Sequence, residues 1–382
     1  MSLMKEISRP CRSNRQIRHI YLLKRHASSS RPITGSSEAE VASAQKYCLD
    51  LLAKYDRPSY TLSTFIPAQA RSTYIALRAL NSTLSLLPDT TTSHTIGLMR
   101  LQFWRDAVNR TASGSPPKEP IAILLAHAMS DLDARTGGSA RLSKIWLTRM
   151  ISAREATLTN DPYPTLEALE SYAENTYSTL LYLTLAALPM ASVTADHVAS
   201  HVGKAAGIAA VLRGLPIVAF PRGGRQAPVS DPSGTQVGGG ARQGAVMLPL
   251  DVMATAGVKE EEVFRQGAEA PGLRDAVFAV ATRASDHLIT VQQMLSNLRA
   301  GKDVGHEFEH EEEEEHQYAA REHQSPLEEV NRAFGVFLPA VATRLWLDRL
   351  ESVDFDIFRP ELLRSDWKLP WKAYMAFNRK SL

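Results

Sequence analysis

Two histidines one helical turn apart are the residues whose spacing most directly suggests chemistry. His197 and His201 stand at positions i and i+4, with Asp196 beside the first. On a helix, side chains at this spacing lie on one face, so both imidazoles could reach a common metal ion. A protein metal site needs at least a third ligand, which this segment does not supply. We therefore expect a solvent-facing or N-terminal-turn pair rather than a metal centre.

The motifs of several common enzyme classes are absent. The sequence contains no dinucleotide-binding or phosphate-binding glycine pattern and no GxSxG nucleophile elbow. The glycine run 238–240 belongs to a Gly- and Pro-rich stretch, and Cys11 and Cys48 provide no disulfide framework and no Cys-based zinc site. The acidic run 311–315, with histidines around it, favours a solvated loop over a metal site. These patterns predict no cofactor.

The helix that must position the two histidines spans 196–216. Apolar residues recur along it at helical spacing, which predicts a buried stripe: Val198, Val202, Ala205, Ala209 and Leu212. Gly203 and Gly207 lie inside it, where each glycine costs about 1 kcal/mol relative to alanine, so we expect close packing against a neighbouring helix. A glycine followed by Pro216 predicts that the helix ends near 213–214.

The overall composition is that of an ordinary globular protein with an unusual beginning. The chain has 382 residues, 44% hydrophobic and 22% charged, and its formal net charge of +2 argues against a dedicated nucleic-acid-binding protein. The first 35 residues are rich in Arg, Lys and Ser and contain one acid, Glu6. Such composition is typical of a mitochondrial transit peptide, with a disordered basic tail as the alternative. We expect residues 1–35 to be a transit peptide, cleaved between Arg25 and Glu38.

Helical periodicity dominates the rest of the chain. No window shows sustained alternation with a period of two, so we predict one all-α domain over 39–382 with essentially no sheet. The expected helices are 39–55, a helix from 67 through 80, 96–110, 121–132, 141–157, 166–188, 275–298 and 327–350. Two inserts, 219–244 and 301–324, are respectively Gly/Pro-rich and acidic, and both predict disorder. The longest apolar run, 180–190, is too short to span a bilayer, which indicates a soluble or peripheral protein.

Several segments together resemble the squalene/phytoene synthase family. They are FIPAQARSTYIALRAL at 65–80, the helices at 166–188 and 196–216, and GAVMLPLDVMATAGV at 244–258. The family has an all-helical fold and condenses two isoprenoid diphosphates. The resemblance therefore implies a single-domain, isoprenoid-synthase-like helical bundle.

The resemblance also implies where that chemistry should take place. Departure of diphosphate creates negative charge that Mg²⁺ must neutralise, and Mg²⁺ needs several carboxylate oxygens close together. The family supplies them as Asp clusters on two facing helices. The matching positions here are Ser85, Leu86 and Asp89 for the first cluster, and Gly214, Ile217 and Val218 for the second. Asp89 is the one carboxylate among them, so we expect a pseudoenzyme without a metal–diphosphate site.

Other residues of the implied pocket also differ from the family pattern. Gly207 and Ala210 stand where the family has an amide pair. Tyr177 and Leu181 replace small residues of the helix that lines the prenyl cavity. Because their side chains are large, we expect them to fill the volume that a prenyl chain would need.

Within the family, the match narrows to the branch of mitochondrial complex I assembly factors. The segments that carry it are TIGLMRLQFW, YAENTYSTLLYLTLAAL, ADHVASHVGKAAGIAAVLRGLP, VDFDIFRP and LPWKAYMAFNRK. This resemblance implies a non-catalytic protein on the matrix side of the inner mitochondrial membrane, in peripheral contact with that membrane. Its implied partners are complex I subunits or other assembly factors, and no nucleic acid.

Two other functions stay open at the level of sequence. One is an isoprenoid or lipid carrier that keeps the cavity without the reaction, and the other is an active Mg²⁺-dependent prenyltransferase. For the assembly role, we expect residues near the vacated site to form part of a protein-binding surface, with His197, His201 and Arg213 as candidates.

Overall fold

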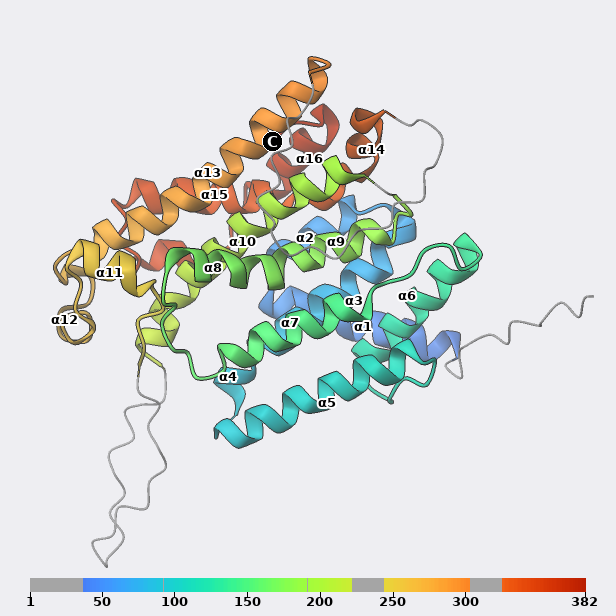
Figure 1. Cartoon of the computed structure of the whole chain (residues 1–382), viewed down its shortest axis with the longest axis horizontal. Helices are drawn as coiled ribbons and strands as arrows, with labels where there is room; N and C mark the ends of the chain where they lie inside the picture. Colours follow the sequence, from blue (N-terminus) through green and yellow to red (C-terminus); the bar gives the residue numbers. More distant parts are fainter. Residues whose placement is uncertain (1–36, 92, 191, 222–243, 303–324) are drawn as a thin grey trace, which may run out of the picture. The chain divides into compact units, whose positions relative to one another are not determined.

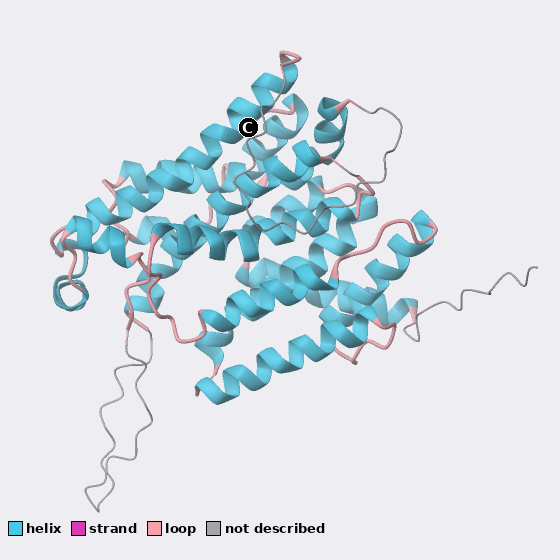
Figure 2. Cartoon of the chain, in the orientation of Figure 1, coloured by secondary structure: helices cyan, strands magenta, loops and turns pink. Residues whose placement is uncertain are grey.

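The computed structural model describes residues 37–91, 93–190, 192–221, 244–302 and 325–382. These residues form helices and connecting loops, and none of them forms a strand (Figure 2), which confirms the predicted all-α class. They all belong to one compact unit, Thr34–Leu382. The predicted transit peptide lies outside the described residues, as do positions 222–243 and 303–324 of the two predicted inserts.

Helices α1 to α10 build the part of the unit before the first insert. Their bounds are α1 Glu38–Tyr55, α2 Arg57–Leu62, α3 Ala68–Ser85, α4 Leu87–Thr90, α5 His94–Ala112, α6 Pro120–Thr136, α7 Lys144–Ala156, α8 Leu166–Ala173, α9 Thr179–Ala186 and α10 Val193–Ala219. The long helices predicted here are confirmed, with ends shifted by a few residues. The short helices α2 and α4 were not predicted, because a helix of fewer than two turns is too short to show an apolar stripe.

Six further α-helices follow among the described residues. They are α11 Leu250–Ala256, α12 Glu260–Gln266, α13 Leu273–Arg299, α14 Pro326–Ala333, α15 Pro339–Ser352 and α16 Leu369–Arg379. Polar caps set where several helices of the unit begin. Ser37 forms a capping box with Glu40 at α1, and the Ser192 hydroxyl accepts from the Ala195 N–H at α10.

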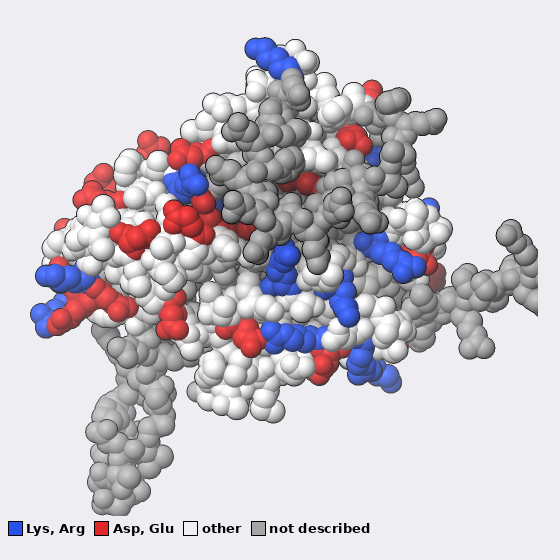
Figure 3. Space-filling view, viewed as in Figure 1, with Lys and Arg blue, Asp and Glu red and all other residues white. Residues whose placement is uncertain are grey.

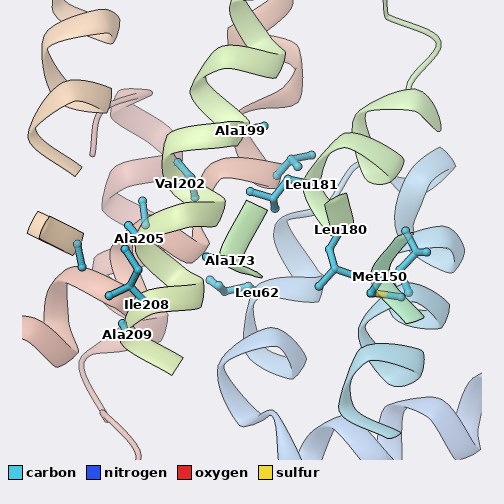
Figure 4. Packing of buried hydrophobic residues seen from close by; sticks show 14 of the residues in the cluster. Leu62, Met150, Ala173, Leu180, Leu181, Ala199, Val202, Ala205, Ile208 and Ala209 are labelled. Carbon is cyan, nitrogen blue, oxygen red and sulfur yellow. The ribbon is translucent and has the colours of Figure 1, made fainter. Parts of the chain in front are cut away.

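α10 is the central helix of the unit (Figure 1). It packs against α8, α9, α13 and α15. The predicted stripe is fully buried at Val198, Val202, Ala205, Ala209 and Leu212. Figure 4 shows residues of α10 beside Ala173, Leu181 and Leu62 from neighbouring helices. Among the described residues, α10 is the one helix long and apolar enough to cross a membrane, but 56% of its most apolar stretch is buried inside the unit, as in a core helix.

The predicted end of α10 near 213–214 is wrong. The helix continues through Gly214 and Pro216 to Ala219. A proline inside a helix costs about 3 kcal/mol, because it lacks an N–H donor and crowds the carbonyl one turn back. Leu215 and Ala219 are buried, so packing offsets this cost. Ala219 is therefore the last residue of a helix and not the first residue of the insert.

The predicted helix 166–188 contains a π-helical segment, Glu174–Ser178, between α8 and α9. This segment lies directly against α10. A Cβ built on Gly203 would lie 2.3 Å from the Cα of Ser178, and the Ser178 hydroxyl donates to the Ser200 carbonyl at 3.0 Å. The bulge thus places Ser178 where the backbones of two helices meet.

The predicted helix 327–350 is also interrupted. A 3-10 turn, Phe334–Phe337, separates α14 from α15. A Cβ on Gly335 would lie 2.2 Å from the Phe65 carbonyl oxygen, so this turn packs closely on the connection between α2 and α3. Pro339 then occupies the first turn of α15, where its missing N–H needs no partner.

Charged side chains are unevenly spread over the face shown in Figure 3. Acidic side chains gather over the end where α11 and α12 lie, and the first turn of α12 alone contains Glu260, Glu261 and Glu262. Lysines and arginines lie among them at that end and are also scattered over the rest of this face. The described residues of this face therefore form no continuous basic patch of the kind that binds nucleic acid.

Candidate functional site

The first group of degenerate positions lies where α3 ends. Ser85 is the last residue of α3, Leu86 follows it, and Asp89 lies in α4. The Ser85 hydroxyl donates to the Ser82 carbonyl of its own helix at 2.9 Å. Asp89 is thus the one carboxylate that this group can offer to a cation.

The second group occupies the last turns of α10. Ile217 is 53% exposed, and a Cβ on Gly214 would meet nothing within 4 Å. The Val218 carbonyl accepts from the Ala245 N–H at 3.3 Å. In Figure 1, the C-terminal end of α10 and helix α4 lie toward the same end of the unit.

The residues of the two groups do not fit a Mg²⁺–diphosphate centre. Mg²⁺ is held by carboxylate and other oxygen ligands in near-octahedral geometry. Across the described ranges, no group of three or more His, Cys, Asp or Glu side chains could hold a metal ion. Asp89 is therefore not part of a group of three or more such side chains among the described residues.

An arginine and aromatic residues form a polar cluster next to the first group. Arg154 of α7 donates Nη2 to the Asn81 Oδ1 at 2.7 Å, and donates Nη1 to the Tyr172 hydroxyl. Its guanidinium lies over the rings of Tyr172 and Tyr177, 5.3 and 5.9 Å from their centroids. Asn81 precedes Ser85 by one turn on α3, so both lie on one face of that helix. We call these residues, with Tyr163, the arginine–tyrosine cluster.

This cluster is poorly suited to proton transfer. Burial raises the pKa of Tyr172 and of Tyr163, whose rings lie 5.4 Å apart, so both phenols stay protonated at neutral pH. Arginine stays protonated in proteins. General acid–base catalysis needs a group that titrates near the working pH. The arrangement is instead suited to holding α3, α7 and α8 together through hydrogen bonds and cation–π contacts.

The helix that the resemblance assigns to a prenyl cavity is packed with side chains. Leu181 is fully buried and Tyr177 is half-buried. A Cβ on Gly207 would lie 2.5 Å from the Ala173 Cβ and 3.1 Å from the Tyr177 Cδ2, so α10 directly touches α8 and the π-helical segment. A cavity of about 290 Å³ lies elsewhere, between α13, α15 and α16. Tyr177 and Leu181 are therefore packed within the unit, and their filling of a prenyl cavity stays a prediction.

The two candidate histidines belong to a row of polar side chains from three helices. His201 Nδ1 lies 2.9 Å from His287 Nδ1, and His201 Nε2 lies 3.2 Å from His197 Nε2. His287 Nε2 lies 2.9 Å from Glu170 Oε1, which also accepts from Arg283. Because both ring nitrogens of His201 face other imidazoles, the three rings do not converge on a metal position.

The expectation of a solvent-facing or N-terminal-turn pair is wrong, because both histidines are partly buried and lie beyond the first turn of α10, which begins at Val193. His197 and His201 are half-buried because α8 and α13 pack over this part of α10. His287, which sequence reasoning missed, lies 86 residues beyond His201 and is buried. No local spacing could have linked the two, since the contact depends on how α13 packs on α10.

Two side chains of the row, His201 and Glu170, have strongly shifted pKa values. Burial, with the neighbouring His287 and His197, lowers the pKa of His201 to about 3. Burial by itself would raise the pKa of Glu170, but hydrogen bonds from His287 and Arg283 lower it to about 2. At neutral pH His201 is therefore neutral and Glu170 is ionised.

Arg213 does not join the histidines. It follows His201 by more than three turns of α10, about 18 Å along the axis. Its guanidinium lies over the Trp346 ring of α15, 5.7 Å from the centroid. The structure thus divides the three candidate interaction residues between two regions of α10, and their role in binding stays a prediction.

Comparison with known proteins agrees with this fold. A family model described as squalene/phytoene synthase matches residues 52–374. The solved structure of a dehydrosqualene synthase in complex with ligand has a TM-score of 0.62 and 13% identity, covering 90% of this chain and 98% of that chain. The squalene synthase HpnC from Alicyclobacillus acidocaldarius has a TM-score of 0.55 and 13% identity, covering 85% of this chain and 99% of that one. At such identity these structures show a shared fold alone.

Curated relatives are more similar in sequence. The protein named NADH dehydrogenase (ubiquinone) complex I, assembly factor 6 from Bos taurus is 34% identical over 359 residues, or 94% of this chain and 89% of that protein. Its namesake from Homo sapiens is 32% identical over 353 residues, or 92% of this chain and 87% of that protein. By both the family match and these identities, the chain belongs to the squalene/phytoene synthase family, within which its relatives include proteins named complex I assembly factor 6.

Proposed function

We propose that this chain is an assembly factor for mitochondrial respiratory complex I that acts by binding other proteins and catalyses no reaction. The observation that carries the proposal is its 34% identity, over 94% of the chain, to a relative named complex I assembly factor 6. The similarity extends over nearly the whole chain and 89% of the relative.

The geometry of the degenerate site supports binding rather than catalysis. Prenyl transfer needs clustered carboxylates for Mg²⁺, and the matching positions here offer Asp89 alone. It also needs room for a prenyl chain, whereas Tyr177 and Leu181 pack beside α10. The same packing argues against an isoprenoid carrier that would use this interior.

The proposal includes a place and a set of partners. We infer that the protein works on the matrix side of the inner mitochondrial membrane, in peripheral contact with it. Complex I subunits or other assembly factors are the expected partners. The basic and serine-rich composition of residues 1–35 supports import into mitochondria.

The experiment that tests this function is deletion of the gene, followed by native gel analysis of the respiratory complexes. We expect selective loss of complex I, restored equally by the wild-type protein and by Asp89→Ala. Loss of a sterol or carotenoid with normal complex I would instead support a prenyltransferase. So would Mg²⁺-dependent release of diphosphate from farnesyl or geranylgeranyl diphosphate by the purified protein.

A further inference from the structure

The segment 367–382 combines aromatic and basic residues and contains no acidic residue. α16 forms most of it. Leu369 and Ala373 are buried where α16 packs on α2 and α15. One face of α16 is thus bound to the rest of the unit, and the opposite face is open to solvent.

Three large aromatic side chains lie on or beside this open face. Trp367 is 83% exposed, Trp371 63% and Tyr374 50%. The rings of Trp371 and Tyr374 stack, with centroids 6.0 Å apart. Tryptophan is highly buried on average in folded proteins. Two tryptophans left this open, next to a tyrosine, indicate a surface that is covered when the protein works.

Basic side chains occur in the same segment as these rings. Lys368 lies over the Trp367 ring, 5.9 Å from its centroid, and Lys372 and Arg379 are exposed on α16. In helices that lie in a membrane interface, tryptophan and tyrosine sit at the level of the lipid headgroups, while lysine and arginine meet the phosphates. The residue types and exposure of α16 match this pattern.

The cavity of about 290 Å³ lies beside α16, between it, α13 and α15, and the exposed Lys372 is part of its lining. Its lining includes the apolar Leu288, Val341 and Met375 and the basic Arg344, Lys372 and Arg379. Asp348 is the one acidic side chain that lines it. The cavity therefore presents an excess of basic side chains, together with apolar ones, to an anionic, partly apolar ligand.

We propose that the α16 face, defined by Trp367, Trp371, Tyr374, Lys368 and Lys372, docks on an anionic phospholipid bilayer, and that the cavity beside it takes the phosphate of one lipid at Arg344. This inference rests on the membrane contact in the proposed function and names the surface that makes it. Charge favours lipid over a protein partner, because every charged side chain of 367–382 is positive. A negatively charged bilayer complements such a surface along its whole length.

Co-sedimentation of the purified full-length protein with vesicles tests the surface. The vesicles are phosphatidylcholine alone, or phosphatidylcholine with about a third phosphatidylglycerol. We expect binding to the anionic vesicles, weakened more than about tenfold by Lys368→Gln with Lys372→Gln, since each basic residue contributes about fivefold. Trp367→Ala with Trp371→Ala should weaken it to a similar extent.

Matched controls come from another exposed face. Met99 and Phe103 on α5 are 67% and 47% exposed. Met99→Ala with Phe103→Ala removes exposed apolar surface from a different face and should bind vesicles like the wild type. Circular dichroism of every variant establishes that the fold is retained. Brominated lipids should quench the tryptophan fluorescence of the wild type, because Trp367 and Trp371 would lie in the headgroup layer.

The cavity is tested by Arg344→Gln. This change should lower the affinity for anionic vesicles several-fold and leave the weak binding to neutral vesicles unchanged. Inorganic phosphate at the same phosphate concentration should not displace the protein from the vesicles. Displacement by phosphate, or equal effects of Arg344→Gln on both kinds of vesicle, would overturn the lipid assignment of the cavity.

The surface itself has its own contrary outcomes. The assignment of the α16 face as the docking surface would be overturned if the wild-type protein did not bind anionic vesicles, or if the α16 variants bound them normally. Variants that bind vesicles normally but no longer restore complex I would assign the α16 face to a protein partner, which also overturns it. Because vesicle binding is measured without complex I, its failure leaves the proposed assembly function standing, and normal complex I after gene deletion would refute that function separately.

Discussion

Arg154 is the residue on which the polar interior of the unit most depends. Its guanidinium donates to Asn81 Oδ1 and to the Tyr172 hydroxyl. Methionine in its place would keep much of the side-chain length but leave both polar groups without this donor. We expect Arg154→Met to lower the free energy of unfolding by about 2–4 kcal/mol, measured by urea denaturation.

Arg149→Met is the matched control for this change. Arg149 lies on the same helix and is exposed, with its guanidinium 5.1 Å from the centroid of the Trp146 ring. An exposed substitution of this kind usually changes the free energy of unfolding by less than about 0.5 kcal/mol. If the two variants lose equal stability, the arginine–tyrosine cluster has no special structural role.

His201 makes stability depend on pH below neutrality. Its pKa falls from 6.5 to about 3 on folding, through burial first and then through His287, His197 and Lys204. The unfolded chain takes up a proton near pH 6.5 and the folded chain does not, so stability decreases as the pH falls through this window. Between pH 6.5 and 5 the loss should reach about 2 kcal/mol in the wild type and disappear in His201→Gln.

Urea unfolding at pH 7, 6 and 5 measures this difference. The pKa of Glu170 is lowered from 4.5 to about 2, so the stability that it contributes is present above pH 4.5 and is lost only as the pH falls toward 2. The two effects are therefore separated above pH 5. Parallel pH profiles of the wild type and the variant would contradict the role given to His201.

Sequence reasoning about single residues succeeded where a local period decides the outcome. The apolar stripe from Val198 to Leu212 is buried as its spacing predicts. It failed for His197 and His201, whose surroundings are set by α8 and α13. A helical pattern identifies which residues share a face, but it does not reveal which faces other helices cover.

At the scale of elements, two glycines of α10 should have opposite effects on stability when each is replaced by alanine. A Cβ on Gly203 would lie 2.3 Å from both the Cα and the Oγ of Ser178, a contact with backbone that only movement of a helix relieves. We expect Gly203→Ala to lower the free energy of unfolding by about 3 kcal/mol. Gly214→Ala meets nothing within 4 Å and should raise it by up to about 1 kcal/mol.

Thermal unfolding of the two variants measures both signs on the same helix. If Gly203→Ala were as stable as the wild type, α10 and the π-helical segment would not be in the close contact described. Loss of stability in Gly214→Ala would mean that the last turns of α10 are more crowded than the open space around that position indicates.

The elements that sequence reasoning missed depend on contacts between distant segments. The π-helical segment Glu174–Ser178 adds one residue where α10 approaches, which leaves the apolar pattern of 166–188 intact on either side. The turn Phe334–Phe337 depends on Phe65, and the last turn of α10 depends on the burial of Ala219. In an isolated helix, Gly214 and Pro216 would indicate the end of the helix. In this protein, tertiary packing extends α10 past both residues to Ala219.

At the scale of the whole molecule, a synthase fold persists around a site with different residues. The helical unit aligns with a dehydrosqualene synthase over 90% of this chain at a TM-score of 0.62. Fold class was predictable because helical periodicity recurs along the whole chain. The α16 face and its cavity were not, because they are formed by α13, α15 and α16, which are distant in sequence. Fold and family could thus be read from the sequence, whereas the surfaces required the structure.

The proposal of a non-catalytic role predicts a specific response to ligand. A ligand at 100 times its dissociation constant raises the free energy of unfolding by about 2.7 kcal/mol, because it binds the folded state alone. If the ligand bound, a gain of this size would raise the melting temperature by several degrees. Because we expect no binding, Mg²⁺ with farnesyl diphosphate should change the melting temperature of this protein by less than about 1 °C. A dehydrosqualene synthase serves as the positive control in the same scan. A comparable rise in this protein would show that it still binds an isoprenoid diphosphate, and the case for a role by protein binding alone would then fail.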